Sequence, residues 1–264
     1  MMEQAVYDNE LGYWEQRLGD DVPLNSVGYH GLSDAFVSWL YRLRARRFCA
    51  AARRLIRPQM RVLDIGSGGG FYVDLWAGLG AKNITATDLT QASIRAIRRR
   101  FPNIEALPFD VGSDQVPFEP ASFEAVSCMD VVHHIIDDGA YARAFENCAR
   151  ILSPGGHLIF TDNFLHGPEF RAPHSASRSL IHIEQVLRDA GFEIVSRRPM
   201  FVLMNYPVDS RSEFFKFYWK VVSFAVQNRH AGRLIGMTLY PIEALLTSIL
   251  KEGPSTEIVV ARKR

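Results

Sequence analysis

The sequence predicts an α/β fold, with a doubly wound and mostly parallel sheet covered by helices. Two observations support this prediction. From residue 56 to residue 200, short apolar runs of strand length alternate with helical stretches of about ten to fifteen residues. The first apolar run, Arg61–Ile65, ends in a glycine-rich turn, which is typical of a strand that leads into a helix. Ligands bind such sheets at the carboxyl ends of the strands, so the residues after each strand are the candidates for a site.

The elements of this core follow one another in a regular order. The strands are expected at Arg61–Ile65, Asn83–Thr87, Ile104–Leu107, Phe123–Met129, Gly156–Thr161 and Phe192–Arg197. The helices are expected at Phe71–Leu79, Gln91–Phe101, Tyr141–Leu152 and Ser177–Ala190. Pro154 and the two glycines after it predict the turn before the fifth strand, and Gly191 ends the last of these helices.

The regions on either side of this core are predicted to be mainly helical. Residues 1–55 are expected to form an N-terminal helical cap, with a break at Asp20–Gly31. Residues 201–255 are expected to form a helical insertion, with helices at Ser212–Val226 and Leu234–Leu250, and residues 256–264 a final strand. The second helix contains Pro241 and Glu243, which favours a buried helix or a lid over a membrane span. We assign residues 1–264 to a single domain.

Composition excludes several classes of protein. Thirty basic and twenty-nine acidic residues nearly cancel, whereas a nucleic-acid-binding domain is expected to be strongly basic. The arginines at positions 42–54 and 98–100 are interpreted as a solvated helix face and a helix C-terminus. Three cysteines, without zinc-ligand spacing, do not form a disulfide framework. The first residues, MMEQAVYDNE, lack the pattern of a secretory signal, so a cytoplasmic location is expected.

The most specific motif is the segment from Asp64 to Gly70 at the end of the first strand. Its glycines allow a tight turn and let backbone N–H groups approach a ligand at a helix N-terminus. Dinucleotide-binding enzymes also have such a loop, so a nicotinamide-dependent oxidoreductase is the alternative. Phe71 stands where their third glycine would be, and Asp64 lies inside the strand end, and both observations disfavour that alternative.

The string Asp64-x-Gly66-x-Gly68-x-Gly70 resembles the first motif of the class I S-adenosylmethionine-dependent methyltransferases, and the resemblance covers residues 55–200. It implies that residues 56–200 are a cofactor-binding core with S-adenosyl-L-methionine as the cofactor. The cofactor-binding residues implied by the resemblance are Asp64, Gly66, Ser67, Gly68, Asp88, Leu89, Asp110, Val111 and Met129. The resemblance implies that Asp88 accepts hydrogen bonds from two ribose hydroxyls and that Asp110 accepts one from the adenine amine.

The resemblance also implies the arrangement of the last strand and the class of acceptor. Thr256–Ala261 is expected to lie antiparallel beside Phe192–Arg197. The small-molecule branch of the family is indicated, because the segment from Asp130 to His133 lacks the Pro-Pro-aromatic motif of the amino-group methylating branch. We therefore expect a small-molecule acceptor and no nucleic-acid partner. A non-catalytic module that binds the cofactor is a further alternative.

Histidines after the fourth strand are the candidate catalytic residues. The reaction is a displacement at an activated methyl group, for which the protein mainly supplies alignment and exclusion of water. A hydroxyl nucleophile also needs a general base, and His134 and His133 lie at the expected rim. Alternatively, His134 shapes the cofactor site. Asp130 with Asp162 and Asn163 could hold magnesium, but the context resembles the metal-free branch, so no metal is expected.

Substrate contacts are expected from segments that cover the strand ends, because such loops often carry recognition. The candidate residues are Tyr29, His30, Asn163, Arg171 and Tyr206. The apolar insertion favours a hydroxyl oxygen of a hydrophobic metabolite or glycan as the acceptor, and residues 212–250 are a candidate for contact with a lipid-like surface. A monomer and a homodimer are both compatible with the sequence.

Overall fold

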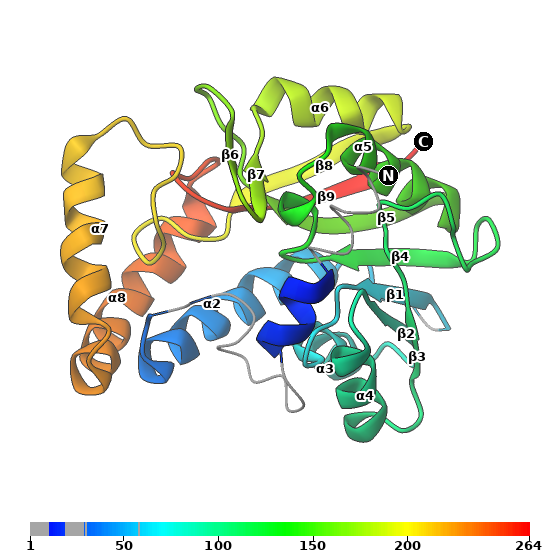
Figure 1. Cartoon of the computed structure of the whole chain (residues 1–264), viewed down its shortest axis with the longest axis horizontal. Helices are drawn as coiled ribbons and strands as arrows, with labels where there is room; N and C mark the ends of the chain where they lie inside the picture. The colour runs from blue at the N-terminus through cyan, green and yellow to red at the C-terminus, as the bar shows by residue number, and fades with distance from the viewer. Residues whose placement is uncertain (1–10, 19–28, 30, 58) are drawn as a thin grey trace.

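The computed structural model describes residues 11–18, 29, 31–57 and 59–264. Within these residues the centre is a seven-stranded sheet in the order β3-β2-β1-β4-β5-β9-β8 (Figure 1). Its strands are β1 (Arg61–Ile65), β2 (Asn83–Asp88), β3 (Glu105–Pro108), β4 (Phe123–Cys128), β5 (Leu152–Asp162), β8 (Phe192–Pro199) and β9 (Glu257–Lys263). Strands β1 to β5 pair in parallel, and β9 pairs antiparallel with both β5 and β8. The predicted fold class is confirmed, including the position of the last strand.

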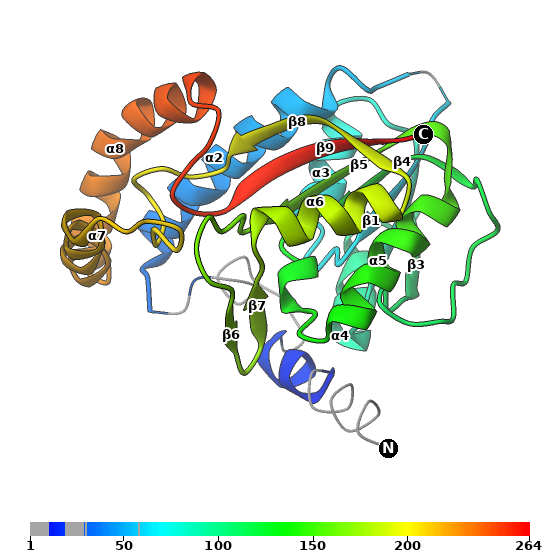
Figure 2. The ribbon, with the colours of Figure 1, turned by 90° about the horizontal axis from the view of Figure 1, so that it is seen from above.

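Helices cover both faces of the sheet. They are α2 (Asp34–Ala52), α3 (Phe71–Gly78), α4 (Gln91–Arg100), α5 (Asp138–Ile151), α6 (Leu180–Asp189), α7 (Glu213–Ala225) and α8 (Arg229–Ile249), with a 3-10 turn η2 at Val132–His134. Figure 1 shows α5 and α6 on one side of the sheet and α3 and α4 on the other. Helix α7 and helix α8 project beyond the edge of the core, as the view from above also shows (Figure 2).

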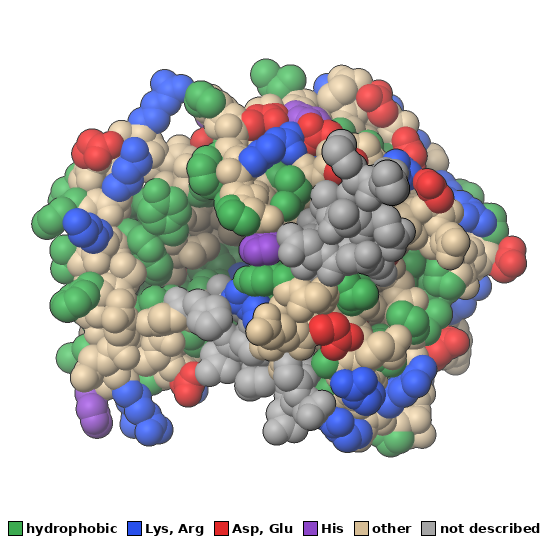
Figure 3. Space-filling model, in the orientation of Figure 1, with side chains coloured by type: hydrophobic (Ala, Val, Ile, Leu, Met, Phe, Trp, Pro, Cys, Tyr) green, Lys and Arg blue, Asp and Glu red, His purple; other side chains and the backbone are tan. Residues whose placement is uncertain are grey.

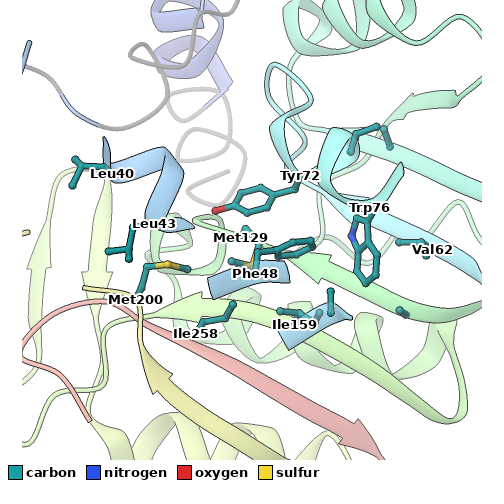
Figure 4. Close-up of a cluster of buried hydrophobic side chains, with 14 of the residues drawn as sticks. Leu40, Leu43, Phe48, Val62, Tyr72, Trp76, Met129, Ile159, Met200 and Ile258 are labelled. Carbon is teal, nitrogen blue, oxygen red and sulfur yellow. The ribbon is translucent and has the colours of Figure 1, made fainter. Parts of the chain in front are cut away.

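Alternation along the strands divides the buried side chains into two clusters, one on each face of the sheet. Val62 packs in the cluster under α2 and α3, and the next residue, Leu63, packs in the cluster under α5 and α6. Figure 4 shows the first cluster, in which Trp76 and Phe48 lie edge to face with ring centroids 5.2 Å apart. The two faces therefore hold the carboxyl ends of the strands in fixed positions.

Three predicted helix starts were wrong. The helix expected at Tyr141–Leu152 begins at Asp138, because the Asp137 side chain accepts a hydrogen bond from the N–H of Ala140. The helix expected at Ser177–Ala190 begins at Leu180, because β6 (Phe170–Ala172) and β7 (Ser175–Ser177) form an antiparallel hairpin just before it. The helix expected to begin at Leu234 begins at Arg229, since the Asn228 side chain accepts hydrogen bonds from the first free N–H groups. In each case local hydrogen bonding sets the boundary, which hydrophobic spacing alone does not reveal.

The interpretation of the first arginine cluster as a solvated face was also wrong in part. The side chains of Arg44 and Arg47 are buried, while those of Arg46, Arg53 and Arg54 are exposed. Helix α8 packs against α2, so only some of the arginines of α2 are exposed to solvent. The consequence is that one arginine of this helix reaches the strand ends.

A glycine and a buried carboxylate, both in α8, attach the helical insertion to the core. A Cβ atom at Gly236 of α8 would lie 2.2 Å from Cδ1 of Trp39, so only glycine permits this close approach to α2. The buried carboxylate of Glu243 accepts hydrogen bonds from the backbone N–H groups of Val202, Leu203 and Met204. Among the described residues, no helix is both long and apolar enough to cross a membrane.

Candidate active site

A cavity of about 310 Å³ lies at the carboxyl edge of the sheet. Its walls come from the loop after β1, the residues after β4, helix α2 and the segments before α7 and β9. The lining residues are Trp14, Arg17, Tyr29, Tyr41, Arg44, Gly66, Ser67, Gly68, Gly69, Phe71, Tyr72, Met129, Asp130, His133, His134, Asn205 and Thr256. The structure therefore brings together the glycine-rich loop, Met129, both candidate histidines and Tyr29, as expected for one site.

The glycine-rich loop is held in shape by backbone interactions. Gly66 has a φ of +69°, and a Cβ atom there would lie 2.2 Å from Cγ2 of Val131. The N–H of Ser67 donates to the carbonyl of Thr87 at 2.8 Å, and the N–H of Gly68 donates to Oδ2 of Asp88 at 2.9 Å. The loop is thus tied to β2 and to the residue expected to bind the ribose.

Asp88 is buried and already anchored by three donors. Besides Gly68, the backbone N–H and the hydroxyl of Thr90 donate to Oδ1 at 2.9 and 2.8 Å. Burial raises the pKa of Asp88, and the hydrogen bonds from Thr90 and Gly68 partly oppose that rise. The two carboxylate oxygens together offer about four lone-pair sites, so the Asp88 side chain can still accept a hydrogen bond from a ligand.

Asp64 supplies a buried acceptor without a partner. The hydroxyl of Ser127 donates to Oδ1 of Asp64 at 2.5 Å, while Oδ2 has no hydrogen-bond partner among the described residues. Burial raises the pKa of Asp64 to about 7, and the hydrogen bonds from Ser127 and Ser67 oppose this shift. An unsatisfied buried oxygen beside a glycine-rich loop fits a ligand that brings a polar donor, such as the amino group of S-adenosylmethionine.

Asp130 projects from a strained position after β4. Its φ of +61° lies in the left-handed region, which a residue other than glycine seldom adopts. The hydroxyl of Thr161 accepts a hydrogen bond from the Asp130 N–H at 2.7 Å and donates to its Oδ1 at 3.2 Å. Oδ2 of Asp130 forms an ion pair with Arg44. These contacts fix the carboxylate on the cavity wall.

Arg44 is the main site residue that the sequence analysis missed. Its guanidinium donates to the hydroxyl of Tyr29 at 2.6 Å and to that of Tyr72 at 3.4 Å, in addition to Asp130. Burial would raise the pKa of Asp130, but Arg44 and, to a lesser extent, His133 lower it overall. Only the helical spacing of Arg44 with the buried Leu40 and Phe48 pointed to an inward position.

The two histidines have different surroundings. Nδ1 of His133 is buried and has no partner among the described residues, and burial together with His134 lowers the pKa of His133 to about 3. Nδ1 of His134 lies 2.7 Å from the carbonyl oxygen of His174, so this nitrogen carries the proton and Nε2 keeps its lone pair. Burial lowers the pKa of His134, which keeps the ring neutral near pH 7.

Five residues predicted to bind the cofactor lie near the same edge but are not among those that line this cavity, namely Asp64, Asp88, Leu89, Asp110 and Val111. Asp110 and Val111 follow β3, where Oδ1 of Asp110 accepts a hydrogen bond from Gly112 at 2.9 Å. Leu89 follows β2 and is half-buried. Their positions at neighbouring strand ends are compatible with contacts to an extended ligand that reaches beyond the cavity.

The residues proposed for substrate contact are spread more widely. Tyr29 lines the cavity, whereas His30 lies outside the described residues. Asn163 joins Ser177 to Thr256 through two hydrogen bonds, and Tyr206 is 51% exposed next to the cavity residue Asn205. The Arg171 guanidinium pairs with both oxygens of Asp138 at 2.8 and 2.7 Å on the outer surface. Arg171 thereby fastens the β6–β7 hairpin to α5.

The carboxylates considered for magnesium are engaged with protein groups. Asp162 accepts a hydrogen bond from the Tyr141 hydroxyl at 2.7 Å, and burial raises its pKa to about 6. Asp130 is paired with Arg44. In the described part of the chain, no three histidine, cysteine, aspartate or glutamate residues form a group suited to a metal ion.

Residues 63–160 match a family model described as "Methyltransferase domain". This segment contains the glycine-rich loop, Asp88, Met129 and both histidines of the cavity. Residues 63–160 therefore form a methyltransferase domain, and the fold of the chain is that of the class I S-adenosylmethionine-dependent methyltransferases. S-adenosylmethionine is therefore its cofactor, and the unpartnered oxygen of Asp64 fits that assignment. The antiparallel β9 strand also separates this methyltransferase from the dinucleotide-binding fold, whose six strands follow the order 3-2-1-4-5-6.

Similar proteins include enzymes named for ubiquinone biosynthesis. The methyltransferase is 36% identical over 125 residues to a "Ubiquinone biosynthesis O-methyltransferase" of Xanthomonas campestris, which is 46% of this chain and 51% of that protein. It is 33% identical over 190 residues to the protein of the same name from Albidiferax ferrireducens, covering 70% of this chain and 65% of the relative. The chain thus spans about half to two thirds of the length of these curated relatives.

Solved structures share the fold of this methyltransferase at low sequence identity. A S-adenosylmethionine-dependent methyltransferase from Mesorhizobium loti has a TM-score of 0.53 and 18% identity, covering 84% of this chain and all of the other. The [4+2]-cyclase SpnF has a TM-score of 0.54 and 21% identity, covering 83% of this chain and 80% of that chain. At these identities the likeness concerns the fold alone.

Proposed function

We propose that this methyltransferase transfers the methyl group of S-adenosylmethionine to a hydroxyl oxygen of a small hydrophobic molecule. The observation that carries the proposal is the composition of the cavity wall, where the cofactor loop, a neutral histidine and aromatic side chains surround one space of about 310 Å³. A hydroxyl acceptor needs a base, and an apolar acceptor needs an apolar wall. Both are present beside the loop.

In this proposal the cofactor is held by the loop and by three acids. Asp64 and Asp88 would accept hydrogen bonds from its amino and ribose groups, and Asp110 would accept one from its adenine. Met129, which lines the cavity after β4, would pack against it. When bound, the cofactor supplies a methyl group that its sulfonium already activates, so the chain mainly has to align the acceptor and exclude water.

His134 is the proposed general base. Because its Nδ1 is occupied by the carbonyl of His174, Nε2 is the nitrogen able to take the proton of an acceptor hydroxyl. The ring is held edge-on against Trp14, with centroids 4.8 Å apart. His133, whose pKa is about 3, is too weak a base near pH 7 and is assigned the role of orienting the acceptor by accepting a hydrogen bond.

Arg44 is proposed to stabilise the acceptor oxygen as it loses its proton. Its guanidinium places a positive charge on the cavity wall, and Asp130 and Tyr29 fix its position. Preorganised charge of this kind stabilises a developing anion without reorganisation at the moment of reaction. The residues Tyr29 and Tyr72 then serve both as apolar walls and as anchors of Arg44.

The hydrophobic nature of the acceptor is supported by the helical insertion and by the relatives. Residues 201–255 are proposed to act as a cap, and Figure 3 shows a hollow between α7 and the core with hydrophobic side chains inside it. The relatives are named for ubiquinone biosynthesis, which favours a phenolic or catecholic acceptor with an apolar substituent. Contact of residues 212–250 with a lipid-like surface remains part of this proposal, as does a monomer or homodimer in the cytoplasm.

The proposal is tested by an assay that measures transfer of a labelled methyl group from S-adenosylmethionine to an acceptor. The protein is incubated with methyl-labelled S-adenosylmethionine and either an alkylated catechol or the corresponding alkylated aniline, with and without a chelator. We expect labelled O-methyl ether from the catechol, little product from the aniline, and full activity in the chelator. Since one fold neighbour is named as a cyclase, the labelled methyl group itself has to be detected in the product. Transfer only to the aniline, or binding of cofactor without any transfer, would refute the proposal.

A further inference from the structure

A second depression lies outside the cavity, between the C-terminal halves of α2 and α8. Its volume is about 380 Å³, and it is lined by Arg46, Arg47, Cys49, Ala50, Arg53, Arg54 and Ser248. Four of these residues are arginines, none is acidic, and none lines the active-site cavity. Figure 2 shows the two helices side by side along one edge of the molecule. We refer to this depression as the arginine pocket.

The charges of the arginine pocket have no counter-charge in the described part of the chain. The side chains of Arg46, Arg53 and Arg54 have neither an ion pair nor a hydrogen bond there. Arg47 is only 9% exposed, and its buried Nε has no partner among the described residues. Burial and the nearby charges of Arg198 and Arg46 lower the pKa of Arg47. An anion in the pocket would relieve this repulsion between the arginines.

An apolar surface adjoins the arginine pocket on α8. Ser248 lines the pocket, and Leu245 and Ile249, its neighbours on the helix, are 60% and 61% exposed. The exposed apolar face continues along α8 through Ile242, Met237 and Leu234. Large apolar side chains at these spacings form one stripe on a helix. The acid within α8, Glu243, is buried and directed to the core, so the stripe carries no negative charge.

Helix α7 repeats this pattern. Phe214, Phe217, Val221 and Phe224 are all more than half exposed and recur at helical spacing. Hydrophobic side chains line the outer edge of this helix in Figure 3. Between residues 211 and 251 the chain has six lysines and arginines and two acids. An apolar stripe flanked by positive charge is the pattern of a helix that lies in the interface of an anionic bilayer.

We propose that the arginine pocket binds the phosphate of an anionic phospholipid while the stripe on α8 enters the acyl-chain boundary, so that the protein docks on anionic membranes. The charge of the pocket selects the headgroup, and the adjoining stripe selects a lipid over a free phosphate. This assignment extends the lipid-like contact proposed above for residues 212–250, and it is independent of the acceptor proposed for the active site because the pocket shares no residue with the cavity.

Vesicle flotation of the full chain tests this proposal. Vesicles of phosphatidylcholine alone are compared with vesicles that contain phosphatidylglycerol. The pocket variant is Arg46→Gln/Arg53→Gln, and the stripe variant is Leu245→Ser/Ile249→Ser. The matched control is Arg150→Gln/Arg188→Gln, which removes the same charge from exposed positions elsewhere. Circular dichroism and thermal unfolding show whether each variant folds, and binding of S-adenosylhomocysteine is measured separately for each protein.

We expect the protein to float with phosphatidylglycerol vesicles only, the pocket variant to partition at least about tenfold less, and the control to behave as the unaltered chain. The stripe variant is expected to lose binding as well. Equal losses in the pocket variant and the control, no flotation of the unaltered chain, or saturable binding of inorganic phosphate without vesicle binding would each overturn the proposal. Flotation without S-adenosylhomocysteine binding would refute the proposed function and leave membrane docking standing.

Discussion

The carboxyl edge of the sheet buries charged side chains, whereas the α7–α8 segment exposes large apolar side chains. At the sheet edge, carboxylates such as Asp64 and Asp88 are buried and held by hydrogen bonds from neighbouring groups. In α7 and α8, large apolar side chains such as Phe217 and Leu245 face solvent instead. The difference indicates that the edge is prepared for a polar cofactor, whereas the helical segment is prepared for an apolar ligand or surface.

The largest expected effect is on catalysis, and it concerns the histidine proposed to deprotonate the acceptor. His134→Gln should lower kcat about 10²- to 10⁴-fold, because the general base is lost, while the affinity for S-adenosylhomocysteine stays unchanged. The pKa of His134 is lowered by burial, so its neutral form persists to lower pH and the acid limb of kcat/KM should lie below pH 6.5. His133→Gln is the matched control and should retain this limb. An acid limb that persists unchanged in His134→Gln would remove this histidine from the role of base.

The next largest effect concerns the buried ion pair at the sheet edge. Arg44→Ala should lower the free energy of unfolding by about 2–3 kcal/mol, because it leaves the partly buried Asp130 carboxylate without its counter-charge. Chemical denaturation measures this loss. The control is Arg46→Ala. Arg46 lies on the same helix but is exposed, so this change should alter the free energy of unfolding by less than about 0.5 kcal/mol. Equal effects of the two changes would show that Arg44 is not needed to hold Asp130.

Strain in the glycine-rich loop gives a smaller effect. Gly66→Ala should destabilise the protein by about 1–3 kcal/mol, because its positive φ is unfavourable with a Cβ and that atom would meet Val131. Cofactor affinity should fall as well. Gly78→Ala is the control, since no atom lies within 4 Å of a Cβ there, and this change should be neutral or slightly stabilising. A destabilising effect confined to Gly78→Ala would contradict the geometry of the loop.

The smallest effect belongs to the helical segment. Asn228→Ala removes the side-chain cap of α8 and should cost about 1 kcal/mol of local stability, seen as faster amide hydrogen exchange in α8. Because the cap is remote from the sheet edge, binding of S-adenosylhomocysteine should not change. A tenfold loss of that affinity would mean that the two regions are coupled and that the contrast drawn between them is wrong.

The sequence predicted the sheet edge better than the cap for a physical reason. The glycine-rich loop depends on residues close in sequence, such as Asp64 and Gly66, so a motif of a few residues specifies it. The place of β9 depends on distant pairs such as Leu158 with Ala261, and it was predicted from the family resemblance. The burial of Arg44 depends on contacts 86 residues away, at Asp130, and local spacing carries little information about it. Likewise, the start of α8 depends on one side-chain cap, and the β6–β7 hairpin on three cross-strand pairs.

The carboxyl edge of the sheet is assigned as the binding site for S-adenosylmethionine. Calorimetric titration with S-adenosylhomocysteine tests it most directly, with NADH as the control ligand and Asp88→Ala as the control protein. The account predicts saturable binding of S-adenosylhomocysteine that is lost in Asp88→Ala, and no binding of NADH. Binding of NADH alone, or binding of S-adenosylhomocysteine that Asp88→Ala leaves unchanged, would contradict it.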